Sequence, residues 1–241
     1  MNMVAEKSDL IDPQQNIIDF LADFTAETTP FSAAKVDDFR EILRPGTTVF
    51  ITFLPGSDFE DTIAIAARLK KEGLNPVPHL AARSIPDAAF LDEGLRRLRG
   101  EADIDEVLTI AGAVDQPLGA FSDSMQVLET GLLDKHGIKR VGVAGHPEGS
   151  PDMPDEAIAA ALTWKNDFAN RSGADVYIVT QFCFEAEPII AWDKAIRAAG
   201  NALPIRIGVP GLATIKTLLN YAKACGIGNS MMFLKKQARN V

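Results

Sequence analysis

From residue 23 onward, the sequence alternates between short runs rich in β-branched residues and longer stretches with the apolar periodicity of helices. The short runs predict strands at 23–28, 47–54, 75–82, 105–112, 140–145, 175–182 and 204–211. The stretches that follow them predict helices at 32–43, 58–73, 87–102, 122–137, 155–173, 185–200 and 214–228. Several of these open on Ser or Asp and close on Gly, the preferred caps of helix ends. The strand starts lie about 30 residues apart, which suits successive right-handed βα units.

Such βα units build either an open doubly wound sheet or a closed (βα)8 barrel. No G-x-G-x-x-G turn follows the first predicted strand, which argues against a dinucleotide-binding open sheet. Polar residues at the carboxyl end of nearly every predicted strand favour the barrel, whose chemistry lies at that end. We therefore predict an α/β fold, a (βα)8 TIM-type barrel that lacks, or is truncated before, the eighth strand and helix.

The length of 241 residues fits one domain with a single large core. We assign 1–19 to a polar N-terminal lead-in and 20–241 to a single barrel domain. Residues 229–241 have the pattern of a helix that is just beginning. An unpaired seventh strand would leave exposed edge groups, so we expect the native chain to continue past Val241 rather than to form a shortened barrel.

Composition limits the partners. A formal net charge of −9 without a compensating basic stripe would repel a phosphate backbone, so we expect no nucleic-acid partner. No apolar run is long enough to span a bilayer and the N-terminus is unlike a secretory signal, which predicts a cytoplasmic protein without membrane contact.

Cys183 and Cys225 lack metal-ligand spacing, and we interpret them as free structural thiols. Barrels often form homo-oligomers, but no apolar stripe identifies an interface here.

Two candidate residues belong to the first and third predicted strands. Glu27 is placed where an acid that faces a cavity could serve as general acid, although a solvated or capping carboxylate is the alternative. His79 follows Pro78 and ends its strand, where it could hydrogen bond a cofactor or be a satisfied core histidine.

Further candidates follow the fifth and sixth strands. His146 and Glu148 lie on the Gly/Pro-rich segment VAGHPEGSP, but no third ligand is evident and we predict no metal site. The Gln181 amide could pair with the donor and acceptor edges of a heterocycle. Phe182 could form a stacking wall or belong to the core. Lys165 could reach a diphosphate or lie on a solvated helix face.

Three segments, PHLAAR at 78–83, VAGHPEGSP at 143–151 and GADVYIVTQFCFE at 173–185, resemble the methylenetetrahydrofolate reductase family. The likeness extends over roughly 20–241 and includes a Glu in the first strand and VPGLATIK in the seventh. Members of this family are (βα)8 barrels that bind FAD and pass a hydride from NADH or NADPH to methylenetetrahydrofolate. The resemblance therefore implies FAD as cofactor, NADH or NADPH as co-substrate and tetrahydrofolate derivatives as partners.

The resemblance also implies roles for single residues. Glu27 matches the acid that assists at folate N5, and Gln181 matches the amide that recognises the pterin, so these two are the expected catalytic pair. Substrate contacts are implied for Gln181, Phe182 and Ile215. Flavin contacts are implied for Thr52, His79, Ala111, Gly112, Ala113, His146 and Lys165.

The chain departs from the family in the loop after the fourth strand. Where the family usually shows Arg-Gly-Asp, this sequence has Ala111, Gly112 and Ala113, and Asp115 follows two residues later. The aromatic residue of the seventh loop corresponds to Ile215. These departures keep alternatives open, namely the reverse oxidation of methyltetrahydrofolate, a folate- or flavin-binding barrel without reductase activity, and a flavin-independent one-carbon enzyme.

Overall fold

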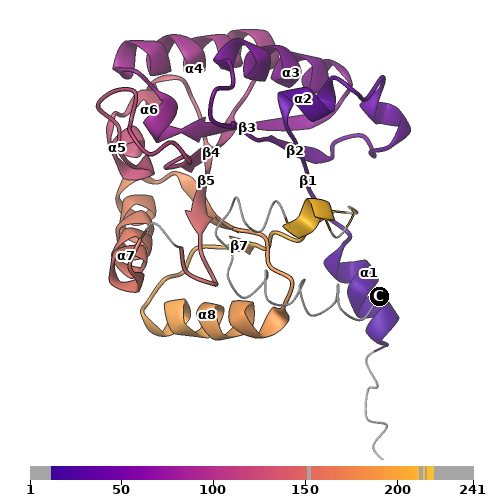
Figure 1. Ribbon diagram of the computed structural model, residues 1–241, viewed down its shortest axis with the longest axis vertical. Helices are drawn as coiled ribbons and strands as arrows, with labels where there is room; N and C mark the ends of the chain where they lie inside the picture. The colour runs from indigo at the N-terminus through magenta and orange to yellow at the C-terminus, as the bar shows by residue number, and fades with distance from the viewer. Residues whose placement is uncertain (1–11, 151–152, 212–213, 215, 220–241) are drawn as a thin grey trace, which may run out of the picture.

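The computed structural model describes residues 12–150, 153–211, 214 and 216–219, and these form a parallel sheet covered by helices (Figure 1). All seven predicted strands are confirmed, and each is shorter than predicted or equal to the prediction. They are β1 Ala26–Thr28, β2 Thr48–Ile51, β3 Asn75–Ala81, β4 Glu106–Ile110, β5 Arg140–Gly145, β6 Asp175–Thr180 and β7 Ile205–Arg206. Neighbours in the sequence are neighbours in the sheet, in the order β1 to β7, and every pair is parallel. The predicted α/β class is confirmed as a curled sheet of seven strands.

Four of the predicted helices are confirmed nearly to the residue, and each follows one strand. They are α3 Phe59–Lys71, α4 Ala88–Ala102, α7 Asp155–Ser172 and α8 Ala186–Ala198. Asp58 and Asp87 cap α3 and α4 by accepting from backbone N–H groups of the first turn. Gly173 ends α7 in the left-handed conformation at φ 71°. Figure 1 shows α3 and α4 side by side outside the sheet, while α7 and α8 follow the later strands.

The helix predicted at 32–43 is wrong as one element. It divides into α2 Pro30–Ala33 and a 3-10 turn, η1 Phe39–Glu41. The Arg68 guanidinium on α3 donates to the backbone carbonyls of Ala33, Val36 and Asp37, at 3.0, 2.5 and 2.9 Å. These carbonyls are held by a distant residue, so the helical periodicity of the segment does not decide its structure.

One other helical prediction and the assignment of the N-terminal lead-in also differ from the structure. The segment 122–137 forms two short helices, α5 Ser124–Glu129 and α6 Leu132–Lys135, because Gly131 between them adopts φ 69°. The polar lead-in contains a helix, α1 Pro13–Phe20, which Asp12 caps at its start. Most of the helix predicted at 214–228 lies outside the described residues.

The curl of the sheet produces two apolar layers. The larger one lies between the strands and the surrounding helices and includes Ile51, Leu95 and Ile178, all essentially inaccessible to solvent. A smaller one fills the inside of the curl, where Phe50, Val77, Leu108 and Tyr177 pack together. Alternate residues of one strand face opposite sides of a sheet, so the strands separate these layers by simple alternation.

The ends of the strands inside the curl differ in character. At the amino ends, Glu106 of β4 is buried and accepts from the Tyr177 hydroxyl at 2.6 Å and from Arg140 at 3.0 Å. The carboxyl ends carry most of the residues predicted for chemistry. No helix within the described residues has the length and apolar character needed to cross a bilayer.

Candidate functional site

The carboxyl ends of the parallel strands bring most of the candidate residues to one rim of the curled sheet. Glu27 lies on β1 opposite Phe50 of β2, and His79 lies on β3 opposite Leu108 of β4. Phe50 and Leu108 belong to the layer inside the curl, so Glu27 and His79 occupy inward-facing positions. His146 and Gln181 directly follow the last residues of β5 and β6. Residues that are distant in the sequence are therefore gathered by strand register.

Glu27 is exposed at this rim and accepts a short hydrogen bond from the Thr52 hydroxyl. Thr52 directly follows β2, and its backbone N–H donates to the Thr28 carbonyl at 2.8 Å, which extends the pairing of β1 with β2. The carboxylate is thus tied to the neighbouring strand while it remains accessible to a ligand.

His79 is buried, and neither of its ring nitrogens has a hydrogen-bond partner in the structure. Its ring meets Phe50 edge-on, with centroids 6.0 Å apart. Burial lowers the pKa of His79, and the nearby charge of Glu27 opposes this shift only in part. His79 is accordingly a neutral imidazole at pH 7, with one donor and one acceptor available to a ligand.

Lys165 of α7 is buried, contrary to the alternative of a solvated helix face. Its ammonium donates to the Ala144 carbonyl at 3.0 Å. Burial lowers the pKa of Lys165 to about 8, and the charge of Asp123 opposes that shift. Burial also lowers the pKa of His146, and the positive charge of Lys165 lowers it further. The pair therefore presents a cation beside a neutral imidazole at pH 7.

The contribution of Asp123 was not predicted from the sequence. Asp123 caps α5 by accepting from the Gln126 N–H at 3.1 Å, so its position in the sequence resembles that of an ordinary helix cap. Its electrostatic influence on Lys165 depends on how α5 and α7 pack, and no spacing in the chain signals it.

Gln181 is half-buried at the end of β6, and its backbone continues the β5–β6 ladder through an N–H bond of 2.9 Å to the Gly145 carbonyl. Its side-chain Oε1 accepts from the Phe182 N–H at 3.0 Å. A backbone N–H can only donate, so this contact fixes which amide atom is the oxygen. The half-buried ring of Phe182 meets that of Phe184 edge-on, at 5.8 Å between centroids.

The loop after β4 passes close to β3. The Ala111 carbonyl accepts from the Arg83 N–H at 2.9 Å. Gly112 has φ 90°, and a Cβ on it would lie 3.1 Å from the Ala81 Cβ. Both conditions favour glycine at this position. Ala113 is exposed next to it.

The remaining predicted residues contribute less. Ile215 lies outside the described residues, so its expected substrate contact cannot be compared with the structure. Cys183 is a buried free thiol, and burial raises its pKa to about 12, with a further rise from Glu148. Within the described ranges no three His, Cys, Asp or Glu residues are grouped as metal ligands would be.

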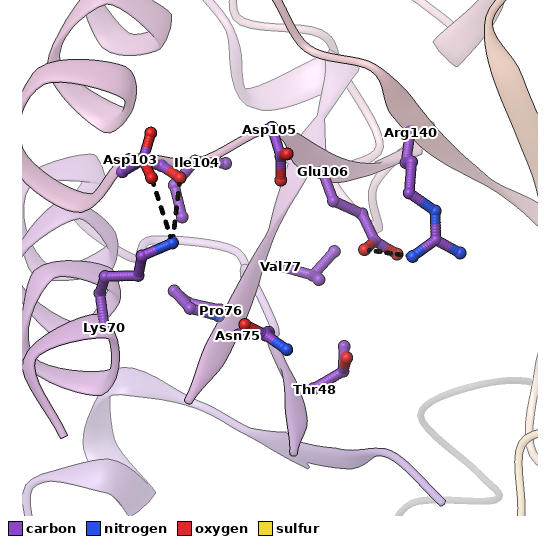
Figure 2. Close-up of a pocket in the computed structure, with 10 residues that line it drawn as sticks. All are labelled: Thr48, Lys70, Asn75, Pro76, Val77, Asp103, Ile104, Asp105, Glu106 and Arg140. Carbon is purple, nitrogen blue, oxygen red and sulfur yellow. Dashed lines mark hydrogen bonds and ion pairs between the residues drawn. The ribbon is translucent and has the colours of Figure 1, made fainter. Parts of the chain in front are cut away.

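A polar cavity of about 230 Å³ lies near the amino ends of β3, β4 and β5. Figure 2 shows the residues that line it. Lys70 lines it and contacts Asp103 at 3.4 Å, and the Glu106–Arg140 pair forms another wall. These residues lie at the amino ends of the strands or before them. The cavity therefore does not belong to the rim that carries Glu27 and Gln181, and the chemistry of the rim residues is the better guide to the site.

The family model and two relatives of known name indicate the same family. The family model described as methylenetetrahydrofolate reductase matches residues 38–236. Methylenetetrahydrofolate reductase 2 of Saccharomyces cerevisiae is 30% identical over 161 residues, which are 63% of this chain and 26% of that protein. Methylenetetrahydrofolate reductase 1 of Schizosaccharomyces pombe is 36% identical over 107 residues, which are 44% of this chain and 16% of that protein. The matched parts are thus about a quarter or less of these relatives.

Among solved structures, a short-chain dehydrogenase/reductase mutant from Serratia marcescens matches 65% of this chain and 71% of its own. Its sequence identity is 13% and its TM-score 0.29, which is too low to bear on the fold.

Proposed function

Because the chain belongs to the methylenetetrahydrofolate reductase family, we propose that it is a flavin-dependent oxidoreductase that interconverts 5,10-methylenetetrahydrofolate and 5-methyltetrahydrofolate. NADH or NADPH is the proposed electron donor, and FAD the proposed cofactor. The seven-stranded curled sheet corresponds in this proposal to the first seven strands of a (βα)8 barrel, with 20–241 as its domain.

The observation that carries the proposal is the position of Glu27 and Gln181 on one rim, at the carboxyl ends of β1 and β6. In the proposed reaction Glu27 holds the proton that is needed at folate N5, and its accessibility at the rim is consistent with this role. Gln181 offers its amide to the pterin, with Phe182 beside it as an aromatic wall. A carboxylic acid and an amide on the same rim suit a planar, protonatable heterocycle.

The residues present fit a flavin. His79 is buried with both ring nitrogens unpaired, which is costly unless a ligand supplies a partner. Gly112 lets the loop after β4 lie against Ala81 of β3, where an added Cβ would be only 3.1 Å from the Ala81 Cβ, and so sets the course of this loop. Lys165 holds a buried positive charge that suits a diphosphate. When bound, a reduced flavin supplies the hydride, and the protein contributes orientation, proton transfer and exclusion of water.

Ala111 and Ala113 replace the charged residues that the family usually has beside this glycine. The loss of these two charged side chains leaves His79, His146 and Lys165 as the proposed polar contacts to FAD. This replacement motivates the alternative of a folate- or flavin-binding barrel without turnover, and the experiment below separates the two.

The test is a visible absorption spectrum of the purified full chain, reconstituted with FAD under anaerobic conditions. We expect NADH or NADPH to bleach the flavin bands and methylenetetrahydrofolate to restore them. Glu27→Gln should slow the second step about 100-fold or more, because general acid catalysis contributes at least that much. Glu187→Gln, a change at an exposed glutamate of α8, is the matched control and should not alter either step.

Protein that cannot be reconstituted with FAD would contradict the flavin-dependent activity. A flavin that stays oxidised with both nicotinamide nucleotides, in protein that still binds folate, would support the binding-only alternative. Normal reoxidation by the folate in Glu27→Gln would remove Glu27 from the mechanism while leaving the activity itself intact.

A further inference from the structure

Glu27 has a long side chain with several rotatable bonds, and the proposed proton transfer requires its carboxyl group to point in one direction. It is exposed on β1, a strand of three residues, and a glutamate loses considerable rotamer freedom when it is held in one orientation. Phe50, its register partner on β2, is apolar and cannot hold the carboxylate. Within the part of the chain that the structure describes, Thr52 is the one residue whose side chain hydrogen bonds to Glu27.

Thr52 is itself well fixed. Its backbone N–H donates to the Thr28 carbonyl at 2.8 Å, so the main chain of residue 52 is paired to the strand that carries Glu27. A β-branched side chain has a restricted χ1 angle, so the backbone leaves only a few positions for the hydroxyl oxygen. The donor of the hydrogen bond to Glu27 therefore belongs to a residue whose backbone is fixed, and the acceptor is the carboxylate at the end of the longer Glu27 side chain.

The hydroxyl also suits a carboxyl group that gains and loses a proton. It has one hydrogen to donate and two lone pairs that accept. Toward an ionised Glu27 it donates, as the structure has it. Toward a protonated Glu27 the same hydroxyl accepts after a rotation of its O–H bond, without movement of heavy atoms. A threonine can therefore hold both forms of the acid, whereas an isosteric valine can hold neither.

We propose that Thr52 is a positioning residue that acts through Glu27, holding its carboxyl group toward the substrate throughout the reaction. The inference rests on the proposed function of Glu27 as the acid. It differs from the flavin contact that sequence resemblance implies for Thr52, since the hydrogen of its hydroxyl is directed to Glu27.

A double-mutant cycle in the full chain, loaded with FAD, tests this role. Thr52→Val should lower kcat for the folate step about 10-fold, the cost of one hydrogen bond to a charged group, with the folate KM changed less than about 2-fold. Thr52→Ser retains the hydroxyl and should recover most of the loss. In the Glu27→Gln background, Thr52→Val should have little further effect, because the residue through which it acts is already altered.

An equal loss from Thr52→Val in both backgrounds would overturn the proposal, as would a loss confined to KM or to flavin content. If Thr52→Val is fully active while Glu27→Gln is impaired, the positioning role of Thr52 is wrong but the proposed function of the protein stands. If the wild-type chain shows no turnover, crystal structures decide the question. We expect one Glu27 rotamer in wild type and a displaced or multiple Glu27 conformation in Thr52→Val, and an unchanged Glu27 in that variant would reject the positioning role.

Discussion

The Tyr177 hydroxyl donates a 2.6 Å hydrogen bond to Glu106 Oε1, from β6 to β4 across the inside of the curled sheet. Arg140 and Arg206 lie against the same tyrosine ring, with guanidinium carbons 5.5 and 4.4 Å from its centroid. Both arginines also pair with Glu106, at 3.0 and 3.6 Å. A buried carboxylate with these partners links β4, β5, β6 and β7 at their amino ends. The group is a structural element of the end of the sheet that faces away from the candidate site.

Removal of the tyrosine hydroxyl should destabilise the protein without affecting the site. We expect Tyr177→Phe to lower the free energy of unfolding by about 1–3 kcal/mol, because buried Glu106 loses a donor. Burial and then Glu106 raise the pKa of Tyr177 above its ordinary value of 10.0. The unfolded chain thus loses this proton first, and wild-type stability falls as pH rises above 10. Urea unfolding at pH 8 and pH 11 measures both effects, and an identical fall in Tyr177→Phe would contradict the assignment.

Lys165 should reduce stability at neutral pH. Its folded-state pKa of about 8 lies below the ordinary 10.5, so the unfolded chain binds more protons between these values and stability rises with pH across that window. Below about pH 8 the full cost of the buried charge is present. We expect Lys165→Met to raise the free energy of unfolding by about 1–3 kcal/mol at pH 7, and by less at pH 10. Lys71→Met, at an exposed lysine of α3, is the control. A difference that does not depend on pH would refute the prediction.

Gly112 and Gly100 form a matched pair of glycines. Gly112→Ala places a side chain at φ 90° with its Cβ 3.1 Å from Ala81, and should cost about 1–3 kcal/mol. Gly100 lies within α4 with no atom within 4 Å of an added Cβ, so Gly100→Ala should stabilise by about 0.5–1 kcal/mol. Thermal unfolding measures both. The affinity for FAD, followed by absorbance, should fall in Gly112→Ala but not in Gly100→Ala. If the two variants bind FAD equally well, the loop after β4 does not contribute to FAD binding.

The hydrogen bonds of Arg68 should stabilise the structure of the segment between α2 and β2. We expect Arg68→Met to lower the free energy of unfolding by about 2 kcal/mol, since three backbone carbonyls and Glu72 lose a charged donor. Amide hydrogen exchange should accelerate around residues 34–39, and the Phe39 N–H, which donates to Glu72, is the most sensitive probe. Arg96→Met, at an exposed pair on α4, should leave these amides unchanged.

Most of the strands were predictable because a short run of β-branched or other apolar residues lies between helix caps, and these signals lie within a few residues. The segment 32–43 was not, because Arg68, more than 30 residues away, determines where its carbonyls point. The break at Gly131 shows that a single left-handed glycine can divide an apolar periodicity. The sequence pattern of a segment therefore predicted its secondary structure wherever no distant side chain hydrogen bonds to the backbone of that segment.

For the candidate site, strand ends predicted which residues share a rim, since parallel strands bring their carboxyl ends together. The contacts between the side chains of these residues could not be predicted from the sequence. The hydrogen bond from Thr52 to Glu27 depends on the β1–β2 register, and the burial of Lys165 depends on how α7 packs. Positions along the rim of the curled sheet follow from the order of the strands in the chain, whereas side-chain pairings follow from packing.

The hydrogen bond between Gln181 Oε1 and the Phe182 N–H has a consequence for ligand selection. The orientation of this amide is set when the protein folds, so the entropy of ordering it does not reduce the affinity for a ligand. One oxygen lone pair is already engaged, and the NH₂ group is the more available edge. A heterocycle that presents a carbonyl or an unprotonated ring nitrogen to this NH₂ group can accept a hydrogen bond from it. A heterocycle that presents an amino group cannot, because two donors would face each other. In the proposed role of Gln181 as the amide that contacts the pterin, this fixed orientation would favour one tautomer of the ring over another.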